Sequence, residues 1–371
     1  MKKLGFGAMR LPVIDGKYDQ VDLQAFCKMA DKFLERGFTY FDTSYVYHGG
    51  KSEEAIKAAL VDRHPRDSFT ITTKLPTFLL KDDGDTRRYF TEQLQRLGTD
   101  YVDYYWLHAL NAATYAQAEQ FHAFEEMKKL RDEGKIRHLG FSFHDSPAVL
   151  DQILTEHPEM EIVQLQLNYF DWDSKSVQSR ACYETAVKHG KQVVVMEPVK
   201  GGQLVHLPAE AEQLMRRKQP ELSIASWGIR FAASLDHVLV VLSGMSTMEQ
   251  VEDNTSYMEH FVPLDQEEQE IIQKTAAILR AKTEIDCTNC GKCTQVCPKN
   301  IPMGAYFDLY NDHCRMGRYS NGMVYYGAFP AGTGKASDCT GCGRCEEVCP
   351  QKPPHEKSRK DVARALETAP L

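Results

Sequence analysis

The sequence predicts a (β/α)8 barrel followed by a small cysteine-rich domain. Through the first 260 residues, short β-like runs alternate with longer amphipathic segments. Eight strands, each followed by a helix, over about 250 residues are typical of this barrel. The cysteines then become frequent, and nine of the eleven lie between residues 287 and 349. This change of composition marks a second domain.

The predicted strands are the short β-like runs. They span Leu4–Met9, Phe38–Asp42, Phe69–Lys74, Val102–His108, Ile136–Phe141, Ile162–Gln166, Gln192–Met196 and Val238–Ser243. The predicted helices carry apolar residues at three- and four-residue spacing, as at Phe121, Phe124 and Met127. They span about 20–36, 52–63, 86–97, 115–133, 147–156, 175–189, 221–234 and 247–257.

An open, doubly wound sheet is the main alternative to the barrel. Such a sheet prefers a glycine-rich, phosphate-binding turn after its first strand. Gly5-Phe6-Gly7 is present, but the chain continues Ala-Met-Arg-Leu-Pro, and no third glycine opens a helix. The closed barrel is therefore the better prediction.

The predicted domains follow from this division. Residues 1–260 form the barrel, 261–282 a linking helix, 283–355 the cysteine-rich domain and 356–371 a charged tail. The linking helix opens with Asp265-Gln-Glu-Glu268, which has the pattern of a capping box.

Charge and hydropathy restrict the partners and the compartment. A formal charge of −8 gives no support to nucleic-acid binding. No stretch approaches the ~20 apolar residues of a membrane span. The N-terminal Met-Lys-Lys is not followed by the apolar core of a signal peptide. We therefore expect a cytoplasmic protein in a reducing environment, with no nucleic-acid or membrane partner.

One cysteine pattern occurs twice. The copies read Cys287-Thr-Asn-Cys290-Gly-Lys-Cys293-Thr-Gln-Val-Cys297-Pro298 and Cys339-Thr-Gly-Cys342-Gly-Arg-Cys345-Glu-Glu-Val-Cys349-Pro350. This is the spacing of bacterial ferredoxins with two [4Fe–4S] clusters, in which the fourth cysteine of each run ligates the other cluster. The predicted ligands are therefore Cys287, Cys290, Cys293 and Cys349 for one cluster and Cys339, Cys342, Cys345 and Cys297 for the other.

Two other uses of the cysteines fit less well. Disulfides suit small secreted domains, and no secretory signal is visible here. Zinc ribbons use paired C-x2-C units, so a third cysteine two residues further on, repeated in both runs, is poor zinc spacing. The sequence therefore predicts an iron–sulfur domain.

Polar residues stand at the predicted strand ends, where a (β/α)8 barrel carries its chemistry. Asp42 ends the second strand, Tyr47 lies in the following loop, and Lys74 and His108 end the third and fourth strands. A tyrosine of pKa ~10 needs help to act as an acid near neutrality, and a lysine beside it favours its ionised form. An aspartate would fix that lysine, and a histidine could orient a carbonyl oxygen. The four residues suit protonation of an alkoxide during hydride transfer.

The first 260 residues resemble the aldo-keto reductase family. The resemblance rests on Gly37-Phe-Thr-Tyr-Phe-Asp42-Thr-Ser-Tyr-Val-Tyr47, Thr72–Lys74, Tyr101–His108, Gly134–Ser142, Val163–Gln164 and Ser243–Asn254. It implies NAD(P)H-dependent reduction of a small aldehyde or ketone, or the reverse alcohol oxidation. Tyr47 would be the general acid, tuned by Asp42 and Lys74, and His108 would position the carbonyl.

The same resemblance implies the nucleotide-binding residues. Ser142 and Gln164 would hold the nicotinamide carboxamide, with Met196 where the family commonly stacks an aromatic residue. The pyrophosphate and adenosine end would lie against Ser243, Gly244, Ser246, Gln250 and Asn254.

Some positions depart from the family pattern. Phe143 replaces the usual asparagine. Gly244 and Gln250 stand where NADPH-preferring members often have Lys and Arg, which favours NADH or mixed use unless Lys200 or Arg230 supplies the charge from a neighbouring loop.

The whole chain is similar to a bacterial and archaeal subgroup of aldo-keto reductases with an appended ferredoxin-type domain. The clusters could stabilise that domain or bind a redox partner protein. A cluster could also lie near enough to the barrel mouth to act on a substrate that is reduced by single electrons. We expect the tyrosines between the cysteine runs to pack against the barrel. They are Tyr306, Tyr310, Tyr319, Tyr325 and Tyr326.

Three functions remain open at this point. The first is a carbonyl reductase with accessory clusters. The second is a redox-sensing or electron-transfer protein that uses the barrel to bind nicotinamide nucleotide. The third is a scaffold with structural clusters only. The matched pair of Tyr47 and Lys74 favours the first.

Overall fold

The computed structural model describes residues 1–174, 177–281, 284–287, 289–316, 322–327, 329, 332–351 and 353–367. Tyr319, one of the tyrosines expected to pack against the barrel, lies outside these residues. No helix in the described part of the chain is long and apolar enough to cross a membrane.

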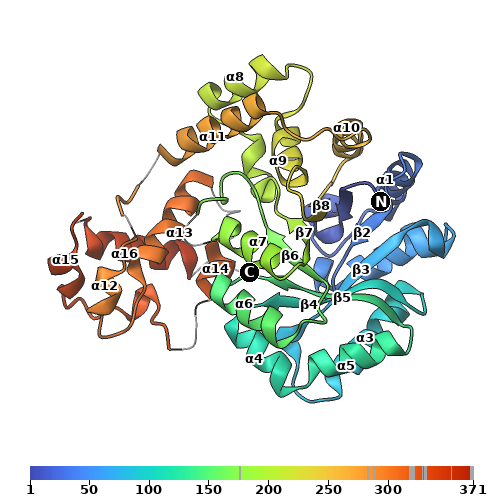
Figure 1. The fold of residues 1–371 in the computed structure, drawn as a ribbon, viewed down its shortest axis with the longest axis horizontal. Helices are drawn as coiled ribbons and strands as arrows, with labels where there is room; N and C mark the ends of the chain where they lie inside the picture. The colour runs from blue at the N-terminus through green and yellow to red at the C-terminus, as the bar shows by residue number, and fades with distance from the viewer. Residues whose placement is uncertain are drawn as a thin grey trace.

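Eight parallel strands close into a barrel in sequence order, and the last strand pairs with the first (Figure 1). The predicted fold class is confirmed. The strands are β1 Leu4–Gly7, β2 Tyr40–Asp42, β3 Thr70–Leu75, β4 Val102–Leu110, β5 Ile136–Phe143, β6 Ile162–Gln166, β7 Gln192–Met196 and β8 Val238–Ser243.

Helices surround the barrel (Figure 1). They are α1 Leu23–Glu35, α2 Ser52–Ile56, α3 Asp85–Leu97, α4 Ala112–Gln120, α5 Ala123–Asp132, α6 Pro147–Glu156, α7 Ser179–Lys188, α8 Ala209–Lys218, α9 Ile224–Ala233, α10 Met248–Met258 and α11 Gln266–Ala281. Helix α8 is absent from the sequence prediction, and it packs beside α11. The predicted capping box is present at α11, where Asp265 and Glu268 exchange hydrogen bonds.

The single helix predicted at 115–133 is wrong. The chain forms α4 and α5 instead, and His122 between them has a φ of 49°. This left-handed conformation cannot continue a right-handed helix. The apolar spacing continues across the break, so the periodicity does not reveal it.

Side-chain alternation along the strands connects the barrel interior with its rim. Tyr40, Trp106 and Ile162 belong to one buried cluster. Side chains alternate between the two faces of a strand, so residues two positions apart lie on the same face. Asp42, His108 and Gln164 each lie two positions after one of these residues, and each therefore lies on the same face of its strand. The packing of the barrel interior therefore places these three polar side chains at the carboxyl end of the barrel.

Glycine at position 140 makes room for the largest interior side chain. A Cβ added to Gly140 would lie 2.3 Å from the Trp106 ring and 2.4 Å from the carbonyl oxygen of Ile162. No side chain fits at that distance. Trp106 can therefore fill the barrel directly below His108.

The cysteine-rich domain has its own core. Its elements are α12 Lys292–Gln295, α13 Met303–Met316, α14 Gly322–Gly327, a 3-10 turn Ala336–Asp338, α15 Arg344–Val348 and α16 His355–Leu366. Helix α16 falls mostly in the predicted charged tail, and Val362 and Leu366 on it are buried in this core. The amphipathic spacing of these two residues explains why the helix packs into the domain rather than projecting from it.

This domain packs against loops at the carboxyl end of the barrel. Lys200, which follows β7, is buried between Asp171 at 2.7 Å and Asp312 of α13 at 2.6 Å. Val177, which follows β6, belongs to the hydrophobic core of the cysteine-rich domain. The ring of Tyr325 on α14 meets His144 after β5, with 5.9 Å between centroids. Three successive loops thus hold the second domain beside the barrel mouth.

Lys200 is an ammonium group out of contact with water. Burial lowers the pKa of Lys200, but Asp171 and Asp312 more than offset this and raise it above its ordinary value. The group therefore stays charged and ties the two domains together.

Replacing Lys200 with Met should weaken the junction, because two carboxylates would remain buried without their cation. Removal of one partner of a buried ion group costs about 3–5 kcal/mol. We expect a loss of this order in the free energy of unfolding, measured by anaerobic urea titration of the full chain. The matched control is Lys218→Met, since Lys218 also contacts two carboxylates, Asp265 and Glu267, but near the surface. Equal losses in both variants would contradict the prediction.

Candidate functional site

The four residues predicted from the strand ends come together in the structure. The Lys74 ammonium donates to Asp42 Oδ1 at 2.5 Å and to the carbonyl oxygen of Thr43 at 2.9 Å. It also donates to the Tyr47 hydroxyl at 3.4 Å. The Tyr47 and His108 rings meet edge to face, with centroids 5.8 Å apart. A phenol and an imidazole thus face one cavity, and the buried ammonium group lies beside the phenol.

Burial controls the protonation of these groups. Burial raises the pKa of Tyr47, while Lys74 opposes the rise. For Lys74, burial lowers the pKa, but Asp42 and Tyr47 reverse this, and the pKa lies above its ordinary value. The phenol is therefore protonated at neutral pH, and the lysine remains a cation beside it.

His108 is held as a neutral imidazole. Burial, with smaller effects from Lys74 and His144, puts the pKa of His108 well below its usual value. Its Nδ1 lies 3.1 Å from Ser44 Oγ, which accepts a hydrogen bond from the Val46 N–H at 3.5 Å. Ser44 can then turn its hydroxyl hydrogen toward Nδ1, which leaves the proton of the ring on Nε2. Sequence reasoning missed Ser44, although it lies two residues after Asp42.

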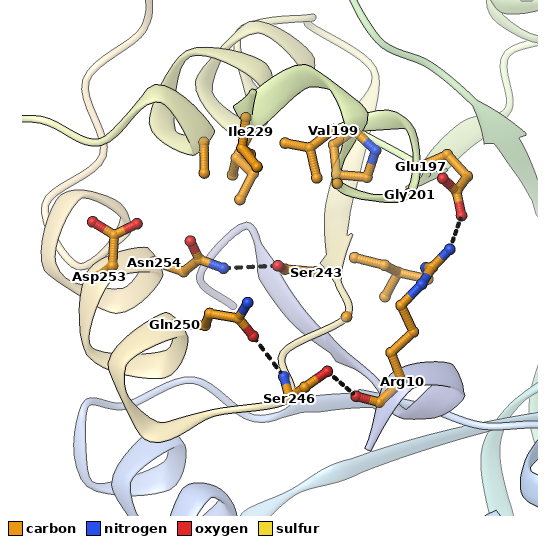
Figure 2. A pocket seen from close by; sticks show the side chains of 16 residues that line it. Arg10, Glu197, Val199, Gly201, Ile229, Ser243, Ser246, Gln250, Asp253 and Asn254 are labelled. Carbon is orange, nitrogen blue, oxygen red and sulfur yellow. Dashed lines mark hydrogen bonds and ion pairs between the residues drawn. The ribbon is translucent and has the colours of Figure 1, made fainter. Parts of the chain in front are cut away.

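Two adjoining cavities form a continuous cleft across the barrel mouth. One contains Asp42, Tyr47, His108, Ser142, Gln164 and Met196 in its wall. The other contains Ser243, Ser246, Gln250 and Asn254 (Figure 2). The cavities share Arg10, Glu197, Leu242 and Gly244. All eight residues predicted for the nucleotide therefore line this one cleft.

Hydrogen bonds fix the far end of the cleft. Asn254 donates to Ser243 Oγ at 2.7 Å, and Gln250 Oε1 accepts from the Ser246 N–H at 2.7 Å (Figure 2). Gln250 and Thr247 form the capping box at the start of α10. Arg10 pairs with Glu197 at 3.2 Å where the two cavities meet.

Cations outside the cleft are engaged elsewhere. Lys200 lies between Asp171 and Asp312, and Arg230 forms a two-pronged ion pair with Glu268 at 2.8 and 2.9 Å. Neither of these two side chains is available for a nucleotide phosphate. The sequence-based alternative that one of them replaces the missing cations is therefore wrong.

The eight cysteines of the two runs form two groups. Burial raises the pKa of Cys287, and Cys293, Cys349 and Cys290 raise it further, which places all four thiols near one another. Cys297 shares the wall of a small cavity with Cys339, Cys342 and Cys345. Each group contains the fourth cysteine of the other run, which agrees with crossed ligation, while the ligand assignment stays a prediction. Among the described residues, no three metal-binding side chains converge as they would on a single ion, whereas a cubane spreads its ligands over four corners.

The two runs also share backbone geometry. The Asn289 N–H points to Cys287 Sγ at 3.4 Å, and the Gly341 N–H points to Cys339 Sγ at the same distance. Asn289 and Gly341 both have positive φ, 50° and 73°. Asparagine is among the few residues that adopt this conformation readily, which explains why one run can lack that glycine. These donors fit thiolates that bind a cluster.

Comparison with protein families identifies both parts. The model of the aldo/keto reductase family matches residues 3–277, and that of a 4Fe-4S dicluster domain matches residues 286–353. The chain belongs to the aldo/keto reductase family. It is an oxidoreductase of that family with a C-terminal 4Fe-4S domain.

This aldo-keto reductase is similar to several known proteins. It is 24% identical over 295 residues to L-galactose dehydrogenase of Arabidopsis thaliana, covering 74% of this chain and 90% of that protein. It is 26% identical over 257 residues to the uncharacterized oxidoreductase YqkF of Bacillus subtilis, covering 60% and 79%.

Solved structures agree with the fold. The aldo-keto reductase AKR11C1 of Bacillus halodurans, in its holo form, has a TM-score of 0.59 and 27% identity, with 74% of this chain and 91% of that one covered. An aldo-keto reductase of Klebsiella pneumoniae in complex with NADPH has a TM-score of 0.60 and 20% identity, with 73% and 90% covered, and supports the fold alone.

One departure from the family pattern now has a structural explanation. Phe143 is 2% exposed and packs in the main hydrophobic core, so it does not replace asparagine as a polar contact. The next residue, His144, does line the cavity of Tyr47 and His108. Sequence reasoning missed it, although it lies two positions after Ser142 and the strand alternation could have indicated it.

The crossed grouping of the cysteines can be tested by counting iron in double variants of this aldo-keto reductase. Two cubanes correspond to about eight irons per chain. Cys287→Ala with Cys349→Ala removes two ligands of one cluster, so about four irons should remain. Cys287→Ala with Cys297→Ala damages both clusters, so little iron should remain. Anaerobic iron and sulfide analysis gives the numbers, and the opposite order of the two variants would show that each run binds its own cluster.

Proposed function

We propose that the protein reduces an aldehyde or ketone with NAD(P)H, or oxidises the corresponding alcohol. The observation that carries this proposal is the buried Lys74 between Asp42 and Tyr47. A protein that only sensed nicotinamide nucleotide would not need a cation buried against a phenol. The continuous cleft beside Tyr47 supports nucleotide binding. When bound there, the nicotinamide nucleotide supplies the hydride.

Tyr47 is the proposed general acid. Its hydroxyl faces the cavity and is protonated at neutral pH, because burial raises its pKa. As negative charge develops on the carbonyl oxygen, the phenol gives up its proton to that oxygen. The Lys74 cation at 3.4 Å stabilises the phenolate that remains. Asp42 in turn keeps Lys74 in place and charged.

His108 is the proposed carbonyl-positioning residue. With Ser44 at its Nδ1, the neutral ring directs an N–H from Nε2 toward the cavity. This donor can bind the carbonyl oxygen without competing with Tyr47 for the role of acid, since a neutral imidazole is a far weaker acid than an imidazolium.

We further propose that NADH is preferred over NADPH. Arg10, the cation in the cleft wall, pairs with Glu197. Asp253 also lines this end of the cleft, where Ser223 donates to its carboxylate at 2.7 Å. A 2′-phosphate binds best to unpaired cationic donors, and a nearby carboxylate repels it.

The clusters are proposed to be accessory to this reaction. A hydride carries two electrons, whereas a cluster passes one at a time. Cys290 and Cys342 are exposed, so a redox partner protein could dock where they lie. Carbonyl reduction in the barrel requires no such partner.

Tyr47→Phe should lower kcat/KM for carbonyl reduction by about 10²–10⁴, the usual contribution of a general acid. In the wild type, kcat/KM should not change with pH around pH 6.5, because His108 is already neutral there. It should fall only as the pH rises through the raised pKa of Tyr47, where the phenol loses the proton it must donate. Steady-state rates of NADH oxidation against a carbonyl panel, from pH 6 to 11, measure both effects.

Tyr45→Phe is the matched control for this prediction. Tyr45 lies two residues away and donates to Glu92, outside the cavity. Its rates should stay close to those of the wild type. Full activity of Tyr47→Phe, with NADH still bound, would rule out the proposed acid.

Gln250→Arg should shift the preference toward NADPH. A guanidinium group at the start of α10 can bind a 2′-phosphate through charged hydrogen bonds. The ratio of kcat/KM for NADPH to kcat/KM for NADH should therefore increase by about tenfold or more. Gln250→Met is the control, because it also removes the helix cap but adds no charge. An equal shift in both variants, or a wild type that already prefers NADPH, would contradict the proposal.

A further inference from the structure

His144 is a cavity residue without a role in the proposed proton transfer. It follows β5 directly, and its backbone N–H donates to the carbonyl oxygen of Leu110 at 2.9 Å. Its side chain lines the cavity that contains Tyr47 and His108. Its Nδ1 is covered and has no hydrogen-bond partner among the described residues. Solvent does not reach this nitrogen, whereas the other ring nitrogen, Nε2, is not covered, so Nε2 is the atom that a ligand in the cavity can reach.

The other polar groups in this part of the cavity already have partners. Ser142 Oγ accepts from the Ala109 N–H at 2.7 Å, and Gln164 donates to Asp42 at 3.3 Å. Glu197 pairs with Arg10 through one oxygen, while its other oxygen is covered and unmatched. The uncovered Nε2 of His144 therefore remains for a substrate hydroxyl to pair with.

His144 carries no charge at neutral pH. Burial lowers the pKa of His144 to about 4. A neutral imidazole offers one donor and one acceptor, so it suits a neutral oxygen rather than a carboxylate or phosphate.

The second domain holds the ring of His144. Tyr325 of α14 is buried and meets the ring at an angle of 70°. Helix α14 packs against α13, and α13 carries Asp312, which is paired with Lys200 of the barrel. The orientation of His144 therefore depends on the docking of the iron–sulfur domain.

We propose that His144 binds a neutral oxygen beside the carbonyl that is reduced, and that Tyr325 of the iron–sulfur domain holds its ring for this contact. The substrate class is then a hydroxyaldehyde or hydroxyketone. His144 is a specificity-determining residue, and Tyr325 is a positioning residue. This inference rests on the proposed carbonyl reduction at Tyr47. A site that hydrogen-bonds a substrate hydroxyl discriminates strongly against the analogue that lacks it.

Lactaldehyde and propanal provide the test, since they share a three-carbon aldehyde and differ by one hydroxyl. The wild type should prefer lactaldehyde in kcat/KM. His144→Phe keeps an aromatic ring against Tyr325 and should lower kcat/KM for lactaldehyde by about tenfold or more, with little change for propanal. His144→Gln restores a hydrogen-bonding group and should recover part of the loss.

Variants of Tyr325 test the contribution of the second domain. Tyr325→Phe keeps the ring and should preserve the preference for lactaldehyde. Tyr325→Ala removes the support and should raise the KM for lactaldehyde more than it changes kcat. Iron content and thermal stability, measured on the same anaerobic samples, establish that each variant keeps its clusters and its fold.

Two results would overturn the inference in different ways. If the wild type reduces carbonyls but His144→Phe changes both aldehydes equally or neither, the role of His144 is wrong and the proposed function stands. If the wild type reduces no carbonyl with NADH or NADPH, the proposed function fails and the inference fails with it.

Discussion

A buried ammonium group must be neutralised, and this constraint organises the carboxyl end of the barrel. Two lysines of the described chain are buried there, Lys74 on β3 and Lys200 after β7. Each would lose its charge or destabilise the fold without carboxylates beside it. Lys74 has Asp42, and Lys200 has Asp171 and Asp312. The first lysine fixes the groups that face the cleft, and the second fixes the domain that lies beside it.

Lys200 also makes the domains interdependent. Asp312 belongs to the iron–sulfur domain, and so does Tyr325, which packs against His144 in the cavity wall. The appended domain therefore also contacts a residue of the cavity wall. Its docking surface reaches the loops after β5, β6 and β7, where a (β/α)8 barrel places its chemistry. This arrangement gives the clusters a structural connection with the cleft that does not require them to carry electrons to it.

The sequence could predict the features that depend on local periodicity. Asp42, Lys74 and His108 follow from strand ends, and the crossed cysteine grouping follows from spacing. It could not predict the role of Lys200, because Asp171 and Asp312 lie in two other segments and only the closed fold brings them together. The break at His122 depends on one backbone conformation that leaves the apolar pattern unchanged. Ser44 and His144 are short-range neighbours of predicted residues, yet their contacts become visible only when the strands pair.

We propose that carbonyl reduction takes place in the barrel by direct hydride transfer, with the clusters outside the reaction. The most direct measurement is a single anaerobic turnover with NADH that carries two deuterium atoms at C4, followed by analysis of the product alcohol and of the cluster absorbance. Direct hydride transfer should place one deuterium on the former carbonyl carbon and leave the cluster spectrum unchanged. An alcohol without deuterium at that carbon, or reduction of the clusters before the product forms, would contradict it.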